Sequence, residues 1–149
     1  MKVTPFDKAI HNDGVVALWS EVFGYGQSRN DPQTTIDQKV ATGDGLFFVA
    51  EDGNGKLQGT VMCGYDGHRG WIYSLAVQPS RQGGGIGSAL MKHAEKELAN
   101  RGCMKVNLQI VANNSGVQGF YEALGFQVEE RISMGKEIEA NLPKEEGGL

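Results

Sequence analysis

"SRQGGGIGSAL", residues Ser80 to Leu90, is the stretch of sequence that decides the fold of this chain. It sets four glycines directly against the start of a predicted helix. A glycine costs roughly 0.5–1 kcal/mol relative to alanine inside regular structure, because it loses more conformational freedom on folding. The stretch follows "WIYSLAV" (71–77), an alternating run that is typical of a strand. The glycines therefore lie in a strand-to-helix turn, where the backbone needs their freedom.

A strand that enters a helix through glycines is typical of phosphate binding. The first N–H groups of a helix carry partial positive charge, and glycines let a phosphate approach the backbone. Two common glycine loops do not fit. A Walker A loop needs GxxxxGK followed by Ser or Thr, which neither Gly55-Lys56 nor Gly135-Lys136 provides. The Rossmann pattern GxGxxG fails because its last position holds Ser88 or Leu90.

Periodicity predicts helices on both sides of this turn. After it, apolar residues at every fourth position predict a helix that ends near Gly102; they are Ile86, Leu90, Ala94 and Leu98. Before it, "NDGVVALWSEVFG" (12–24) predicts a helix with Asn12 or Asp13 as its cap. Residues 31–45 predict a second helix that opens with the favourable pair Asp31-Pro32.

The remaining segments predict strands and one more helix. Residues 45–77 indicate three strands, because hairpin-turn sequences separate them at 52–55 and 66–67. In the third strand, the side chains on one face are expected to alternate with those on the other: Trp71, Tyr73, Leu75 and Val77 against Ile72, Ser74 and Ala76. Further strands are predicted at 1–6, 105–112 and 127–138, and a helix at 114–125. This order predicts one α/β domain, with hairpins early and a crossover helix late.

Composition excludes several classes of protein. The chain has 149 residues and a net charge of −4, with no basic cluster of the kind that binds nucleic acid. The longest apolar run, Leu46 to Ala50, is far too short to span a membrane. No secretory signal is visible at the N-terminus, so we expect a cytoplasmic protein. Cys63 and Cys103 form no metal-binding motif, so we expect no metal; a buried thiol is the better interpretation of Cys63 than a nucleophile.

Two motifs resemble those of the GNAT superfamily of N-acetyltransferases. The run from Gln82 through Gly85 to Gly87 resembles the family's acetyl-CoA loop, Q/R-x-x-G-x-G/A. "NNSGVQGFYEALGF" (113–126) resembles its second signature. "GYDGHRG" (64–70) and the length suggest the small bacterial YpeA-like members. The resemblance implies an α/β fold, with a mixed, mostly antiparallel sheet, a splayed parallel pair and flanking helices. It covers residues 1–140, and we expect a disordered tail at 141–149.

The resemblance also implies roles for individual residues. The backbone of Leu75, Ala76 and Val77 would pair with pantetheine, and an N–H in this segment would polarise the thioester carbonyl. Asn114 would contact the pantetheine arm, and Tyr121 would protonate the departing thiolate as general acid. Backbone amides would hold the pyrophosphate at Gln82, Gly83, Gly84, Gly85, Gly87 and Ser88.

The sequence does not single out one residue as the general base. Members of the family that use a central-strand glutamate place it where this chain has Trp71. An amine with a pKa near 10.4 needs roughly 4–5 kcal/mol to reach its neutral form at pH 7, so a route for the proton is required. Glu51, Asp66, His68 and Tyr73 are the candidates. An exposed turn position for His68 and a core position for Tyr73 are the competing structural interpretations.

The sequence therefore predicts an acetyl-CoA-dependent N-acetyltransferase that acts by direct attack. The acceptor would be a primary amine, either a protein N-terminus, a lysine or a small molecule. The alternative is an acetyl-CoA-binding sensor or interaction domain without turnover. Homodimers are common in the family, so a homodimer is considered, and neither nucleic acid nor membrane is expected as a partner.

Overall fold

The computed structural model describes residues 1–24, 29–111 and 115–143. These residues form two compact units, Met1–Leu108 and Gln109–Leu149, and each unit is described by itself. The expected tail at 141–149 lies mostly outside the described residues. The predicted single domain over 1–140 stays a prediction.

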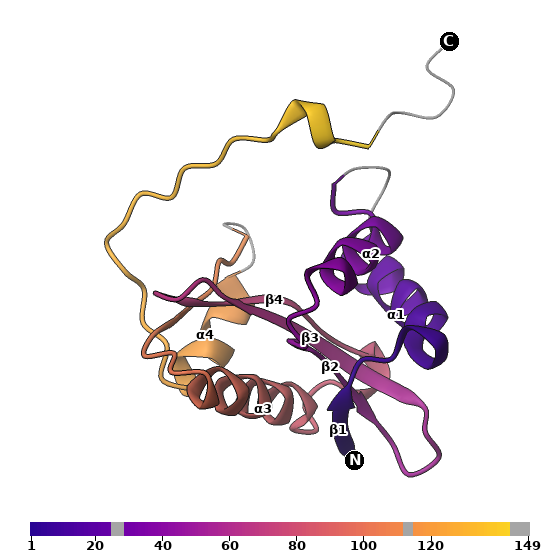
Figure 1. The fold of residues 1–149 in the computed structure, drawn as a ribbon. Coiled ribbons are helices and arrows are strands. Elements are labelled where there is room, and N and C mark those ends of the chain that lie inside the picture. The colour runs from indigo at the N-terminus through magenta and orange to yellow at the C-terminus, as the bar shows by residue number, and fades with distance from the viewer. Residues whose placement is uncertain (25–28, 112–114, 144–149) are drawn as a thin grey trace. The chain divides into compact units, whose positions relative to one another are not determined.

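The first unit is built on a five-stranded sheet in the order β1-β2-β3-β4-β5 (Figure 1). Its strands are β1 (Lys2–Pro5), β2 (Phe47–Glu51), β3 (Leu57–Tyr65), β4 (Gly70–Val77) and β5 (Val106–Asn107). The first four strands pair antiparallel, and β5 pairs parallel to β4. This is the mixed sheet with one parallel pair that the sequence predicts.

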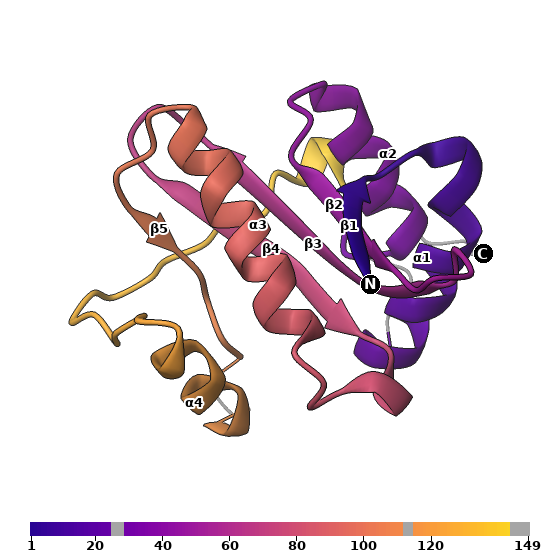
Figure 2. The ribbon, with the colours of Figure 1, turned by 90° about the horizontal axis from the view of Figure 1, so that it is seen from below.

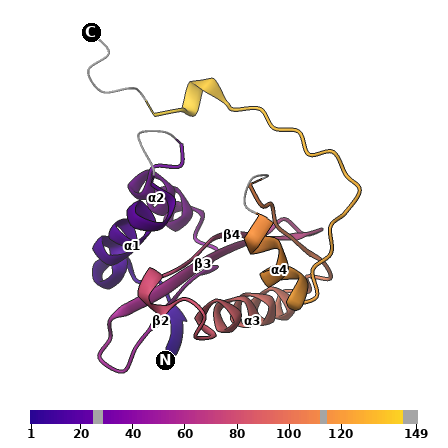
Figure 3. The ribbon, with the colours of Figure 1, turned by 180° about the vertical axis from the view of Figure 1, so that it is seen from behind.

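Three helices of this unit cover the two faces of the sheet. Figures 1 and 3 show α1 (Lys8–Phe23) and α2 (Pro32–Thr42) on one face and α3 (Ile86–Asn100) on the other. Figure 2 shows α3 lying across its face of the sheet. The core under α1 and α2 includes Leu18, Trp19 and Phe47, all buried. On the opposite face, Leu90, Ala94 and Leu98 of α3 are fully buried, as their spacing predicts.

The predicted cap of the first helix is wrong. The helix begins at Lys8, and the side chain of Asp7 accepts a hydrogen bond from the Ala9 N–H at 3.0 Å. Asn12 is inside the helix and its amide bonds to the side chain of Gln33 on α2. The sequence predicts too late a start because His11 is the one buried residue among 8–11, so the apolar pattern does not extend into the first turn.

The predicted start of the second helix and the predicted ends of the first and third helices are confirmed, whereas the second helix ends at Thr42, earlier than the predicted residue 45. Asp31 caps α2 by accepting from the Thr34 N–H, and Pro32 occupies the first turn. Gly24 and Gly43 end α1 and α2 in the left-handed conformation, and Gly102 has the same conformation after α3. These ends are predictable because each depends on side chains or a φ angle within a few residues.

The second unit holds α4 (Ser115–Ala123) and a short 3-10 helix, η2 (Glu139–Asn141). The predicted strand at 127–138 is wrong, because these residues form no strand and are exposed. Of the predicted strand at 105–112, the described residues 105–111 form only the two-residue strand β5, and residue 112 lies outside the described residues. An alternating pattern becomes a strand only where a neighbouring strand accepts its backbone hydrogen bonds, and no strand pairs with 127–138 in the described structure.

Candidate active site

The glycine turn is held by hydrogen bonds on the strand side. The Gln78 N–H donates to the Gln58 carbonyl at 2.8 Å, just after β4 ends. A 3-10 turn, η1 (Pro79–Arg81), follows. The glycines then reverse the chain, with φ of +83° at Gly83 and +87° at Gly85, values that side chains rarely adopt. The sequence pattern therefore places glycine where the backbone requires it.

The N-terminus of α3 presents unpaired amides to the open side of this turn. Gly85 is the N-cap and makes no side-chain cap, and the first helical bond runs from the Ala89 N–H to the Gly85 carbonyl at 3.0 Å. The N–H groups of residues 86–88 precede this bond, so they have no acceptor within the helix. Nothing lies within 4 Å of where a Cβ would stand at Gly83 or Gly85. The turn therefore fits a pyrophosphate that approaches the backbone.

The parallel pair separates early along β4, near the end of the strand that lies away from this turn. β4 pairs with β5 only at Gly70 and Trp71, which lie opposite Val106 and Asn107. β4 then continues to Val77, while β5 ends at Asn107. Within Met1–Leu108, the backbone of residues 75–77 therefore has no strand partner on the β5 side. The predicted splay is confirmed, and it leaves backbone groups that can pair with an extended ligand.

Two of the four base candidates lie in the turn between β3 and β4. The Asp66 carboxylate accepts hydrogen bonds from the backbone N–H groups of Arg69 and His68, each at 2.8 Å. These two hydrogen bonds, Arg69 first, lower the pKa of Asp66. His68 is exposed in the same turn. This turn precedes β4, whereas the glycine turn follows it, so the two lie at opposite ends of the strand.

Glu51 lies at the end of β2, two strands from β4. Its carboxylate faces the ring of His11 on α1, with Oε1 3.2 Å from Nε2. The Nδ1 atom of the same ring accepts the Asp7 N–H at 2.8 Å, so the ring proton is on Nε2 and donates to Glu51. The carboxylate therefore already serves to hold α1 against the sheet.

Tyr73 is the one base candidate on β4 itself. It is 49% exposed, so the core interpretation of this residue is wrong. Partial burial, and next the charge of Asp66, raise the pKa of Tyr73. Its phenol is therefore protonated at neutral pH. It can relay a proton through its hydroxyl, but it is a weak general base.

Tyr121 and Asn114 are the predicted site residues that come from the second signature, 113–126. Tyr121 is buried on α4, and its ring meets Phe120 and Phe126 edge to face, with centroids 5.0 and 5.8 Å apart. Burial raises the pKa of Tyr121, which keeps the phenol protonated at neutral pH. Asn114 lies outside the described residues.

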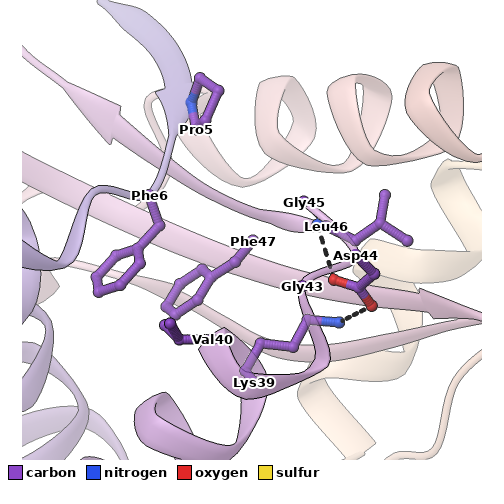
Figure 4. A pocket seen from close by; sticks show the side chains of 9 residues that line it. All are labelled: Pro5, Phe6, Lys39, Val40, Gly43, Asp44, Gly45, Leu46 and Phe47. Atoms are coloured by element: carbon purple, nitrogen blue, oxygen red, sulfur yellow. Dashed lines mark hydrogen bonds and ion pairs between the residues drawn. The ribbon is translucent and has the colours of Figure 1, made fainter.

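A cavity of about 180 Å³ lies away from the glycine turn. It is at the start of β2, and because β2 and β4 run in the same direction, the turn that follows β4 is at the other end of the sheet. Figure 4 shows the Lys39 ammonium and the Asp44 carboxylate pointing toward each other at its edge, 2.8 Å apart. Lys39 also donates to the Cys63 carbonyl, so this pair joins α2 to β3.

The Cys63 thiol is buried, as the sequence predicts. Burial is the largest cause that raises the pKa of Cys63 to about 12. The thiol is therefore neutral at physiological pH and is not a nucleophile. Among the described residues, no group of His, Cys, Asp and Glu could hold a metal ion.

β4 carries a β-bulge that the sequence pattern does not predict. The register pairs Thr60 with Ala76 but Met62 with Tyr73, so β4 carries one extra residue between the two pairs. Ser74 lies within it with φ of +49°. The bulge brings Ala76 to the same face as Tyr73, so the simple alternation expected for 71–77 is wrong beyond Ser74. Nothing in the residue types of this strand signals the bulge, because serine seldom adopts positive φ.

The chain matches the sequence model of the acetyltransferase (GNAT) family over residues 12–126, and it belongs to that family. The PaiA N-acetyltransferase of Thermoplasma acidophilum, solved with coenzyme A, has a similar fold. Its TM-score is 0.74 at 17% identity, over 88% of this chain and 92% of that one.

Two further solved structures share the fold. The glucosamine-6-phosphate N-acetyltransferase of Arabidopsis thaliana has a TM-score of 0.68 at 21% identity, over 91% of this chain and 97% of that one. The aminoglycoside 6'-N-acetyltransferase of Acinetobacter haemolyticus has a TM-score of 0.70 at 15% identity, over 93% of this chain and 99% of that one. At these identities the likeness shows the fold alone.

Family membership confirms the predicted fold class and the predicted enzyme class, an acetyl-CoA-dependent N-acetyltransferase. The narrower YpeA-like resemblance stays a prediction. No helix in the described parts of the chain is long and apolar enough to cross a membrane.

Proposed function

We propose that this enzyme transfers the acetyl group of acetyl-CoA to a primary amine by direct attack. The observation that supports this most is the strand, glycine turn and helix at 75–88, with its open glycines and unpaired helix amides. In the proposal, the amides of Gln82 to Gly85, Gly87 and Ser88 hold the pyrophosphate. The backbone of residues 75–77 pairs with pantetheine, and Asn114 contacts the same arm.

The reaction itself forms one bond and breaks one. The neutral amine nitrogen attacks the thioester carbonyl carbon, the N–C bond forms and the C–S bond breaks. A backbone N–H near Leu75 stabilises the charge that develops on the carbonyl oxygen. The Tyr121 hydroxyl protonates the departing thiolate, and the proton of the amine leaves through the base.

The four base candidates differ in how free they are to act. The Glu51 and Asp66 carboxylates are already hydrogen-bonded, and Tyr73 is protonated but stands on β4. Conservative variants separate them: Glu51→Gln, Asp66→Asn, His68→Gln and Tyr73→Phe. The variant that loses the rise of kcat/KM with increasing pH, which reports deprotonation of the base, identifies the base. If all four keep the wild-type profile, none of these side chains is the base.

The cofactor part of the proposal is tested by binding. Gly85→Val forces a branched side chain to φ of +87° inside the turn. We expect it to weaken acetyl-CoA binding at least about tenfold in titration calorimetry, because the turn no longer presents its amides. Gly102→Val is the control, since it places the same side chain at φ of +90° at the other end of α3. Equal affinities for the two variants would contradict the proposal.

The acceptor is tested by product mass spectrometry across peptides, polyamines, amino sugars and amino acids. Acetylation of one class names the substrate. Tight acetyl-CoA binding with no product from any amine would instead favour an acetyl-CoA-binding module. We further propose a cytoplasmic enzyme, able to form a homodimer, without a nucleic-acid partner; the acidic net charge supports the last point.

A further inference from the structure

A buried hydrogen-bond relay runs from α1 to the bulge in β4. The Trp19 indole N–H donates to the Thr60 hydroxyl oxygen at 2.8 Å, and the Thr60 hydroxyl donates to the Ser74 carbonyl at 2.9 Å. An indole N–H only donates and a carbonyl only accepts, so the direction of both bonds is determined. Trp19 and Thr60 are both 0% exposed. The bond between Trp19 and Thr60 is therefore shielded from water, and the bond to Ser74 is partly buried.

The relay holds a strained part of the backbone. Ser74, at φ of +49°, is the one residue other than glycine with positive φ in the described structure. Such a conformation is unfavourable for a residue with a side chain and persists only where its surroundings impose it. At the bulge the Ser74 carbonyl accepts from a side chain of β3, the Thr60 hydroxyl. Without that hydroxyl, this carbonyl would lose a buried donor.

The Ser74 carbonyl also fixes the direction of the next N–H. A trans peptide is planar, with its C=O and N–H pointing in opposite directions, and no peptide bond of the described residues is cis. The Ser74 carbonyl points to Thr60 on β3, so the Leu75 N–H points away from β3. On that other side of β4, the partner strand β5 has already ended. The Leu75 N–H is therefore directed to the side on which the proposed function places acetyl-CoA.

We propose that Thr60 and Trp19 are positioning residues that aim the Leu75 N–H at the thioester carbonyl of acetyl-CoA. Neither side chain touches the substrate. Trp19 orients the Thr60 hydroxyl, and Thr60 orients the Ser74–Leu75 peptide, which donates to the oxygen that becomes negative during transfer. This inference rests on the proposed function, since that function places the thioester beside Leu75.

Three variants test the relay. Thr60→Val removes the hydroxyl at nearly constant volume, Thr60→Ser keeps it, and Trp19→Phe removes the indole donor. Removing an oxyanion donor outright costs about 10²–10³ in kcat. Here the donor is present but misaimed, so we expect a loss of about 10- to 100-fold in kcat for Thr60→Val. We expect a smaller loss for Trp19→Phe and recovery of most activity in Thr60→Ser.

A second measurement does not need the amine. The Leu75 N–H can bond the thioester carbonyl of acetyl-CoA, which free CoA lacks. We therefore expect wild type and Thr60→Ser to prefer acetyl-CoA over CoA by about five- to tenfold in calorimetry, and Thr60→Val to lose that preference. Affinity for CoA itself should change less than about threefold, since the glycine turn is untouched.

A matched core variant separates positioning from general destabilisation. Ile36→Val shortens a fully buried side chain of α2 in the same core. A loss of kcat in Ile36→Val equal to that in Thr60→Val, at equal loss of thermal stability, would overturn the inference. So would a Thr60→Val enzyme that keeps both kcat and the acetyl-CoA preference. A wild-type protein that acetylates no amine refutes the proposed transfer instead, and the affinity ratio still decides the relay.

Discussion

Gly59 lies on β3 where this strand packs against both β4 and α3, and a side chain at this position has no room. A Cβ at this position would stand 2.7 Å from the Ala76 carbonyl oxygen, 3.0 Å from a methyl of Leu90 and 3.3 Å from a methyl of Ile86. The first of these atoms is backbone of the neighbouring strand and cannot move aside alone. Gly59→Ala therefore requires β4 or α3 to shift, and overpacking of this kind costs about 1–3 kcal/mol.

The measurement is thermal unfolding of Gly59→Ala beside Gly64→Ala. Gly64 is on the same strand, and the nearest atom to its Cβ position is Tyr73 Cε2 at 4.0 Å. Alanine is favoured over glycine inside a strand by roughly 0.5–1 kcal/mol, so Gly64→Ala should be neutral or stabilising. At about 2–4 °C per kcal/mol for a chain of this size, Gly59→Ala should lower Tm by roughly 2–12 °C.

The same substitution also perturbs the candidate site. Ala76 is on the strand that leads into the glycine turn, and Ile86 is the first residue of α3. A shift of either element changes where the helix amides point, so Gly59→Ala should weaken acetyl-CoA binding more than Gly64→Ala does. If the two variants have equal Tm and equal affinity, the close approach of these three elements is refuted.

Three further predictions follow from single side chains. Tyr121→Phe should lower kcat by about 10²–10⁴ while acetyl-CoA affinity changes little, with Tyr65→Phe as the control; an unchanged kcat would assign Tyr121 to packing. Because burial raises the pKa of Cys63 to about 12, the unfolded chain loses this proton first. Stability should therefore fall above about pH 9 by up to ~1.4 kcal/mol per pH unit, and chemical denaturation of Cys63→Val should show a shallower fall. Asp7→Ala should lower the free energy of unfolding by about 1 kcal/mol because α1 loses its cap, and Asp13→Ala should change it little. A larger loss for Asp13→Ala than for Asp7→Ala in urea titrations would instead support a helix that begins near Asp13.

Local chemistry made much of this protein predictable from its sequence. The glycine turn at 82–87, the Asp31-Pro32 start of α2 and the hairpin turns each depend on residues within one turn of chain. A residue such as Gly85 adopts its φ because of its own covalent structure, whatever surrounds it. The phosphate-binding character of the turn could therefore be inferred before any packing was known.

The environment of the base candidates required the tertiary structure. No neighbour in the sequence indicates a partner for the Glu51 carboxylate, because that partner, His11, lies forty residues earlier. Tyr73 could be core or surface by its alternation, and the extent of the helix cover over β4 decides its exposure. Such properties belong to pairs of elements, and a sequence window of ten residues contains only one member of each pair.

The bulge at Ser74 shows the same division most clearly. The sequence alone determined that residues 71–77 form a strand, that glycines follow it and that a helix begins near Ile86. Only the tertiary structure decided that Ser74 takes φ of +49°, because the donor that stabilises its carbonyl is Thr60 on β3, and Thr60 is in turn oriented by Trp19 on α1. A conformation that is unfavourable for serine in isolation is stable here because buried hydrogen bonds from distant segments offset its cost.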